Sequence, residues 1–273
     1  MQKTILVTGA TDGIGLETAR MLVTMGHNVL LHGRNAAKLK EVENTLSTEI
    51  KGQERGSIAS YVADLSRMSE VESLAKDVAQ TYAQLDVLIN NAGVFKISDP
   101  ITQDGLDVRF VVNAIAPYLL TQQLMPLMGP SARVVNVSSA AQSPVNLDAL
   151  AGKIQISQDF SAYAQSKLAL TMWSYALSLK ENSPVMIAVN PGSMLGSKMV
   201  KQAFGVAGGD IRVGAEILTR AALSDEFATA SGQYFDNDSG CFASPHANVL
   251  NSKKSEAVVD AIEAVLATLT QTI

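Results

Sequence analysis

Cysteine and histidine are scarce in this sequence. Its 273 residues include one cysteine, Cys241, and three histidines. A single thiol cannot form a disulfide within the chain, and this favours a reducing compartment. Because zinc sites need several Cys or His ligands, we expect no metal site.

Long apolar runs are missing as well. No run reaches the roughly 18 residues that a membrane span requires. Strand-like sequence begins at Thr4, which leaves no room for a signal peptide. We therefore expect a cytoplasmic protein without a membrane span.

Clusters of basic residues are also absent. The formal net charge is −5, and the nearest approach to a basic cluster, Lys198 with Lys201, is too sparse for a nucleic-acid-binding face. Hydrophobic residues make up 47% of the chain, enough for a large core. With no repeat or linker, the sequence predicts one domain over residues 1–273.

Short apolar runs alternate with longer amphipathic stretches along the chain. The runs predict strands at 4–8, 28–31, 58–62, 87–89, 134–137, 185–189 and, less distinctly, 232–235. The stretches predict helices at 14–25, 36–50, 69–82, 102–127, 162–179 and 255–269, the fourth bent near Pro117 and Pro126. Continuous apolar strands are typical of sheets that are buried on both faces. The pattern predicts an α/β fold, a doubly wound parallel Rossmann sheet in three α/β/α layers.

A glycine-rich turn follows the first predicted strand. The segment T-G-A-T-D-G-I-G places Gly9, Gly13 and Gly15 between a strand and a helix. Such a turn lets backbone approach a pyrophosphate at a helix N-terminus. The expected cofactor contacts here are Gly9, Thr11, Asp12, Gly13, Ile14 and Gly15. A tight strand-to-helix turn without a ligand is the alternative.

The end of the second predicted strand indicates the dinucleotide. An NAD-binding site usually has a carboxylate at this point, whereas an arginine accommodates the 2′-phosphate of NADP. This chain has Arg34 there and Lys38 one helical turn later. We therefore expect NADP rather than NAD, with Arg34 as an ordinary surface residue as the alternative.

Tyr163 and Lys167 lie four residues apart on a predicted helix and so share one face. Proton transfer at neutral pH would need a tyrosine whose pKa is lowered, which a nearby ammonium favours. On its own the pair is close to chance, because a core-packed tyrosine and a solvated lysine give the same spacing.

Five motifs occur in one order and resemble the short-chain dehydrogenase/reductase family. They are T-G-x-x-x-G-x-G, the N-N-A-G run at 90–93, the serines at 138–139, Tyr-x-x-x-Lys at 163–167 and N-P-G at 190–192. The resemblance covers residues 3–235. The separation of 24 positions from Ser139 to Tyr163 and the run A-Y-A-Q-S-K-L-A are most similar to the retinol-dehydrogenase-like branch.

The resemblance implies a role for each catalytic candidate. Tyr163 would be the acid/base, and Lys167 would lower its pKa and bind the nicotinamide ribose. Ser139 would bind the substrate oxygen, with Ser138 only its neighbour. Asn113 would hold a water that connects Lys167 to solvent, and a purely structural asparagine is the alternative.

The resemblance also implies further cofactor contacts. They are Asp64 and Leu65 along the adenine, Asn91, Ala92 and Gly93 after the fourth strand, and Pro191, Gly192 and Ser193 beside the nicotinamide. Asp64 as a cap of the next turn is equally compatible with the sequence. The family often has a threonine at the position of Gly196, so Ser193 or Ser197 would replace its contact.

Two segments are expected to shape the substrate pocket: a rim insertion near 142–160 and a lid near 193–212. The apolar lid favours an apolar substrate, although an ordinary amphipathic helix would have the same composition. The implied activity is hydride transfer between NADP(H) and a carbonyl/alcohol pair on a small molecule. The alternatives are a catalytically silent NADP(H)-binding regulator and a methyltransferase. The family also implies a possible homo-oligomer through its long central helices.

Overall fold

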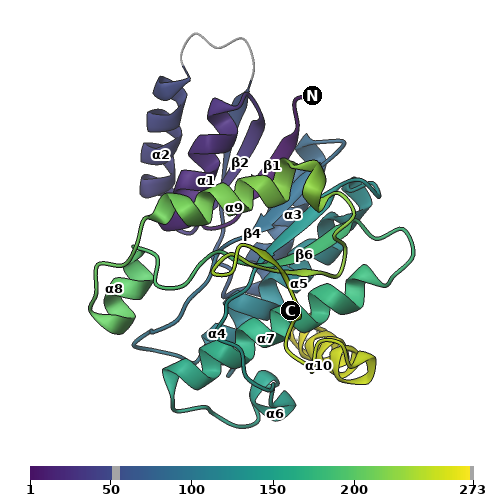
Figure 1. Cartoon of the computed structure of the whole chain (residues 1–273). Helices are drawn as coiled ribbons and strands as arrows, with labels where there is room; N and C mark the ends of the chain where they lie inside the picture. The colour runs from purple at the N-terminus through teal and green to yellow at the C-terminus, as the bar shows by residue number, and fades with distance from the viewer. Residues whose placement is uncertain (51–55, 271–273) are drawn as a thin grey trace.

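The computed structural model describes residues 1–50 and 56–270, and every strand in them joins one sheet (Figure 1). The strand order is β3-β2-β1-β4-β5-β6-β7-β8, parallel throughout except for the antiparallel pair β7–β8. The strands are β1 Thr4–Val7, β2 Asn28–Gly33, β3 Ser57–Val62, β4 Val87–Asn90, β5 Arg133–Val137, β6 Val185–Asn190, β7 Tyr234–Asp236 and β8 Cys241–Ala243. The α/β fold predicted from alternating strands and helices is confirmed.

Helices cover both faces of the sheet, as Figure 1 shows. One face carries α1 Gly13–Thr24, α2 Ala36–Glu49 and α9 Ile211–Leu223; the other carries α3 Met68–Thr81, α5 Ala116–Leu124, α7 Asp159–Ser178 and α10 Ser252–Thr270. Shorter helices are α4 Val108–Phe110, α6 Leu147–Leu150 and α8 Lys198–Phe204, with 3-10 turns η2 Met125–Leu127 and η3 Asp225–Phe227. In β1, Leu6 joins one core while Ile5 and Val7 join the other. This alternation explains why the strands read as unbroken apolar runs.

The helix predicted at 102–127 is shorter and interrupted. Its first turn begins only at Val108, and a π-helical segment, η1 Val111–Ile115, separates α4 from α5. Pro117 lies in the first turn of α5, where a missing N–H is tolerated. The break therefore falls around Asn113 rather than at Pro117.

One helix start differs slightly and one helix was not predicted. The helix predicted from residue 69 begins at Met68, after Arg67, which makes no side-chain cap. Helix α9 was not predicted, although its buried residues Ala215, Leu218 and Ala222 recur at helical spacing. Ile217 and Leu218 belong to the same buried face, so the amphipathic pattern was present in the sequence and was overlooked.

The C-terminal helix α10 packs against α7. Tyr118 of α5 donates a hydrogen bond to Glu263 of α10 over 2.6 Å. The chain's own last helix thus covers part of the central helices on this face. Among residues 1–50 and 56–270, no helix is both long enough and apolar enough to cross a membrane.

His32 connects the glycine-rich turn to the sheet. Its Nδ1 accepts a hydrogen bond from the Gly9 N–H over 3.3 Å, and its Nε2 lies 3.0 Å from the Ala63 carbonyl oxygen. The ring can satisfy both partners only as the neutral tautomer with its proton on Nε2. Burial lowers the pKa of His32 to about 4, so the ring stays neutral and holds the ends of β1, β2 and β3 together.

This neutral ring predicts a loss of stability in mild acid. Between pH 6.5 and pH 4 the unfolded chain binds a proton at His32 that the folded chain does not, so the free energy of unfolding falls as the pH falls through this window. At neutral pH, His32→Leu loses two hydrogen bonds and is less stable than the wild type. We expect the difference in the free energy of unfolding between the wild type and His32→Leu to narrow by up to about 3 kcal/mol towards pH 4. Urea unfolding of both proteins at pH 7, 5.5 and 4.5 measures the gap; a constant gap would contradict the assignment.

Candidate active site

A cavity of about 870 Å³ lies along the carboxyl ends of the central strands. This edge is where open parallel sheets bind their ligands. Every residue predicted to contact the cofactor borders it: Gly9, Thr11, Asp12, Gly13, Ile14, Gly15, Arg34, Asp64, Leu65, Asn91, Ala92, Gly93, Tyr163, Lys167, Pro191, Gly192 and Ser193. Ser139 borders it too, but Asn113 does not.

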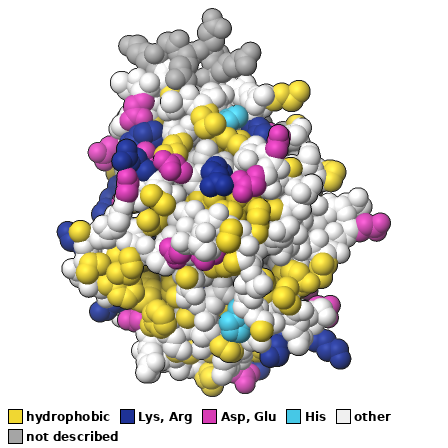
Figure 2. Space-filling view, viewed as in Figure 1, with side chains coloured by type: hydrophobic (Ala, Val, Ile, Leu, Met, Phe, Trp, Pro, Cys, Tyr) yellow, Lys and Arg dark blue, Asp and Glu magenta, His cyan; other side chains and the backbone are white. Residues whose placement is uncertain are grey.

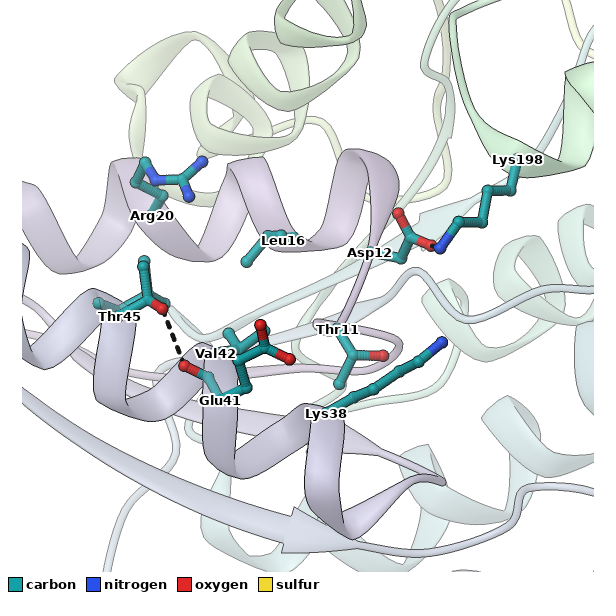
Figure 3. A pocket seen from close by; sticks show the side chains of 10 residues that line it. Thr11, Asp12, Leu16, Arg20, Lys38, Glu41, Val42, Thr45 and Lys198 are labelled. Atoms are coloured by element: carbon teal, nitrogen blue, oxygen red, sulfur yellow. Dashed lines mark hydrogen bonds and ion pairs between the residues drawn. The ribbon is translucent and has the colours of Figure 1, made fainter.

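A smaller cavity of about 290 Å³ opens beside the glycine-rich turn (Figure 3). Thr11, Asp12, Lys38 and Lys198 border both cavities. In Figure 3, Asp12 and Lys198 point towards each other, and they form an ion pair between the turn and α8. This contact ties the segment predicted as a lid to the glycine-rich turn.

The glycine-rich turn forms a backbone cradle. Gly9 and Gly13 have φ angles of +67° and +61°, which side chains disfavour. A Cβ on Gly15 would lie 2.3 Å from the Asn91 Nδ2 and 2.4 Å from the Gly9 carbonyl oxygen. The amide of Asn91 also donates to the carbonyl of Thr8 over 2.8 Å. These contacts bring the N-terminus of α1 to the cavity, an arrangement that fits a dinucleotide pyrophosphate.

At the end of β2, Arg34 and Lys38 border the cavity together with Asp64. The Asp64 carboxylate accepts hydrogen bonds from the N–H and the hydroxyl of Ser66, so it caps a turn as the alternative interpretation proposed. Burial acts to raise the pKa of Asp64, but the bonds from Ser66 and the charge of Arg34 outweigh it and hold that pKa below its usual value. The carboxylate is therefore ionised beside Arg34 at neutral pH.

Lys167, a residue of α7, is buried. It is 3% exposed, and its ammonium donates to the Val137 carbonyl at the end of β5 over 2.7 Å. Burial lowers the pKa of Lys167 to about 8. Its Nζ lies 5.7 Å from the centre of the Tyr163 ring.

The pKa of Tyr163 moves in the direction opposite to the expected one. Removal of the ring from water raises it, and a hydrogen bond with Ser139 offsets this only in part. The Lys167 ammonium lies 5.7 Å from the centre of the Tyr163 ring and donates to the Val137 carbonyl. Tyr163 is therefore a protonated phenol at neutral pH in this structure.

Ser139 and Ser138 have different surroundings. The Ser138 hydroxyl is 2.7 Å from the Thr171 hydroxyl of α7, whereas the Ser139 Oγ accepts the Ala141 N–H over 3.0 Å. The Ser139 carbonyl accepts from the Gln142 amide and from the Tyr234 hydroxyl. Gln142 and Tyr234 carry no motif in the sequence, and the fold alone brings them to this serine.

Asn113 lies next to the site without bordering the cavity. Its Oδ1 accepts the Val94 N–H over 2.8 Å, and its Nδ2 donates to the Val94 carbonyl and to the Ser166 hydroxyl, each over 2.9 Å. These bonds join η1 to the loop after β4 and to α7. Both amide N–H groups of Asn113 are engaged and its oxygen accepts one hydrogen bond, while its predicted contact with a water stays a prediction.

The two serines after β6 also have partners. Ser193 donates from its N–H and its hydroxyl to Asp238 in the turn between β7 and β8. The Ser197 hydroxyl accepts the Val200 N–H and caps α8. Asp238 follows no motif, and its contact with Ser193 joins positions 45 residues apart.

The segments predicted as rim and lid flank the cavity. The rim, residues 142–160, contains α6 and the start of α7. It is anchored by Arg109, which is 1% exposed and pairs with Asp107 and Asp159 over 2.6 Å each. On the face shown in Figure 2, apolar side chains gather where α8 lies in Figure 1; exposed ones nearby are Met194, Phe204 and Val206. In the described part of the chain, no group of three or more His, Cys, Asp or Glu could hold a metal ion.

Comparison with known sequences finds one family. The family model described as short chain dehydrogenase matches residues 3–205. Human polyprenol dehydrogenase is 36% identical over 180 residues, a match that spans 63% of this chain but only 53% of that relative. Human retinol dehydrogenase 12 is 30% identical over 269 residues, spanning 93% of this chain and 83% of the relative.

Solved structures have the same fold. An uncharacterised protein from Mycobacterium paratuberculosis superposes with a TM-score of 0.79 at 26% identity, over 97% of this chain and 93% of that one. The angucycline C-6 ketoreductase LanV with bound NADP gives a TM-score of 0.67 at 25% identity, over 86% and 93%.

The tight contacts of Gly15 predict that even one methyl group will disrupt the cradle. We expect Gly15→Ala to lower the free energy of unfolding by about 1–3 kcal/mol, because the new Cβ overlaps Asn91 and the Gly9 backbone. Thermal and urea unfolding measure the change. Gly129→Ala is the matched control, since a Cβ at that position meets nothing within 4 Å. Equal stability of the two variants would show that the turn is looser than described.

Proposed function

The chain belongs to the short chain dehydrogenase family, in its retinol-dehydrogenase-like branch, and from this premise we propose an NADP-dependent oxidoreductase that interconverts a carbonyl group and an alcohol on a small apolar substrate. One observation carries the proposal: Tyr163, Lys167 and Ser139 meet in the same cavity that the glycine-rich turn borders. A silent regulator would not need this combination of groups.

The protonation states suggest how the residues divide the work. A bound nicotinamide dinucleotide supplies or accepts the hydride. The Ser139 hydroxyl donates a hydrogen bond to the substrate oxygen and orients it. The Tyr163 phenol, whose pKa is raised by burial, gives its proton to the oxygen as negative charge develops there. These states favour reduction of a carbonyl at neutral pH and oxidation of an alcohol at alkaline pH.

Lys167 acts beside Tyr163. With its pKa near 8, the side chain is mostly an ammonium at neutral pH. That charge stabilises a tyrosinate after proton transfer and can donate to a ribose hydroxyl. Asn113 keeps α7 and η1 in register through Ser166, so its part is to position the lysine and the tyrosine.

NADP is supported by charge at the end of β2. Arg34 and Lys38 border the cavity there, and the carboxylate of Asp64, which borders it too, is engaged by Ser66. The solved relative LanV contains NADP. An apolar substrate is supported by the exposed apolar residues of the lid, and the names of two relatives specify alcohols, a polyprenol and retinol.

The proposed chemistry predicts that Tyr163→Phe loses turnover but keeps cofactor binding. Removal of the phenol proton should lower kcat by at least about 100-fold, the usual contribution of a general acid. A panel of ketones and aldehydes followed by NADPH absorbance measures kcat, and NADPH fluorescence measures binding. Tyr175→Phe on the same helix is the matched control. Full activity in Tyr163→Phe would overturn the proposed mechanism, and NADPH binding without any turnover by the wild type would favour the silent regulator.

The cofactor preference predicts a selective effect of Arg34→Ala. Loss of a charge-assisted bond to the 2′-phosphate should weaken NADPH binding by about 10- to 100-fold and leave NADH binding unchanged. Lys40→Ala is the control, because Lys40 pairs with Glu43 on α2 away from the cavity. Catalytic efficiency of the wild type with both cofactors completes the test: a preference for NADH would refute the NADP assignment.

A further inference from the structure

Aromatic rings gather at one end of the cavity. The chain has only seven Phe, six Tyr and one Trp, yet Phe95, Phe160, Tyr163 and Phe204 all border this cavity. Phe95 lies at the centre of the group. Its ring centre is 4.7 Å from that of Tyr163, 5.7 Å from that of Phe204 and 6.3 Å from that of Phe160.

The four rings come from different parts of the fold. Phe95 follows the N-N-A-G run after β4, Phe160 lies in the first turn of α7 at the end of the rim, and Phe204 ends α8 in the lid. Phe95 is 9% exposed, whereas Phe160 and Phe204 are 55% and 48% exposed. Phe95 is therefore an inner wall, and the other two phenylalanines form an outer pair that solvent reaches.

Phe95 lies beside the place where the reacting carbon of a substrate would be bound. The oxygen of a reacting carbonyl has to lie between the hydroxyls of Tyr163 and Ser139. Because the Phe95 ring is in direct contact with the Tyr163 ring, it is positioned to contact a substituent on the carbonyl carbon. A flat π-system can stack on Phe95 or meet it edge to face, which adds attraction beyond the buried area. A saturated ring of similar size is thicker and gains only the area term.

We propose that Phe95 is a specificity-determining residue that selects substrates in which the carbonyl or alcohol carbon bears an aromatic ring. This inference rests on the proposed function and adds the substrate class to it. The reaction itself is unchanged. The carbonyl carbon gains the hydride of NADPH, and its oxygen gains the Tyr163 proton, so the products are the alcohol and NADP⁺.

The test compares acetophenone with cyclohexyl methyl ketone in the wild type and in Phe95→Leu. Leucine keeps an apolar side chain at the position and removes the ring. The ratio of kcat/KM for the aryl ketone to that for the cyclohexyl ketone should fall by about 2- to 10-fold, the range expected for one lost aromatic pair. Comparing this ratio between two proteins cancels the different intrinsic reactivity of the two ketones.

Two further variants make the result specific. Phe95→Tyr keeps the ring and should keep the wild-type ratio. Phe242→Leu removes a ring from a second aromatic group, formed with Phe227 and Phe235 outside the cavity, and should also leave the ratio unchanged. If Phe95→Leu lowers the efficiency with both ketones by the same factor, Phe95 only packs the lid and the inference is wrong.

A binding measurement separates this inference from the proposed function. Calorimetric titration of each ketone into the protein saturated with NADP⁺ gives dissociation constants without turnover. We expect the preference for acetophenone over its cyclohexyl analogue to fall by the same 2- to 10-fold in Phe95→Leu. If the wild type reduces no carbonyl compound, the proposed function fails, and the binding ratio still decides the role of Phe95. An unchanged binding ratio, or no binding of either ketone, overturns the inference.

Discussion

The attachment of α7 to β5 through buried polar groups is the constraint on which the site depends. Lys167, Thr171 and Ser174 face the sheet at helical spacing. They bond to the Val137 carbonyl, to Ser138 and to Asn136, respectively. A buried polar group that loses its partner costs about 1–3 kcal/mol, so sliding α7 along the sheet would break several such bonds at once. Tyr163 lies one turn before Lys167, so this register also fixes its position relative to the carboxyl end of β5.

The burial that this attachment requires shifts the pKa values of Lys167 and Tyr163, at some cost to the stability of the fold. A pKa near 8 for Lys167 means that keeping its ammonium under α7 at neutral pH is unfavourable relative to water. Its bond to Val137 compensates only in part. Tyr163 is affected in the opposite sense, since burial favours its neutral form. One desolvated environment thus moves the two pKa values apart: that of Lys167 falls from 10.5 to about 8, while that of Tyr163 rises from 10.0.

Sequence reasoning succeeded where structure depends on local pattern. The unbroken apolar run at Ile5–Val7 and the glycines after it define a strand and a turn within a few residues, and both are as predicted. The interruption at η1 was not predicted, because it accompanies bonds between Asn113 and Val94, 19 positions away in the sequence. The contacts of Tyr234 with Ser139 and of Asp238 with Ser193 are likewise long-range and carry no motif. For the pKa of Tyr163, spacing indicated the charged neighbour, Lys167, but not the burial that raises it.

The rim and the lid, which flank the cavity, are held by different kinds of contact. The buried guanidinium of Arg109, held in place by Asp107, bonds to Asp159 and to the Ile156 carbonyl and so anchors the rim from inside the protein. Across the cavity, the ion pair of Lys198 with Asp12 is exposed, and such pairs contribute at most about 1 kcal/mol. That ion pair therefore contributes little to holding α8, which is also held by the contact of Phe204 with Phe95. Under the proposed function, the lid would yield to an entering substrate before the rim does, and Phe95, which packs against Phe160 on the rim and Phe204 on the lid, would be the inner surface that the substrate meets.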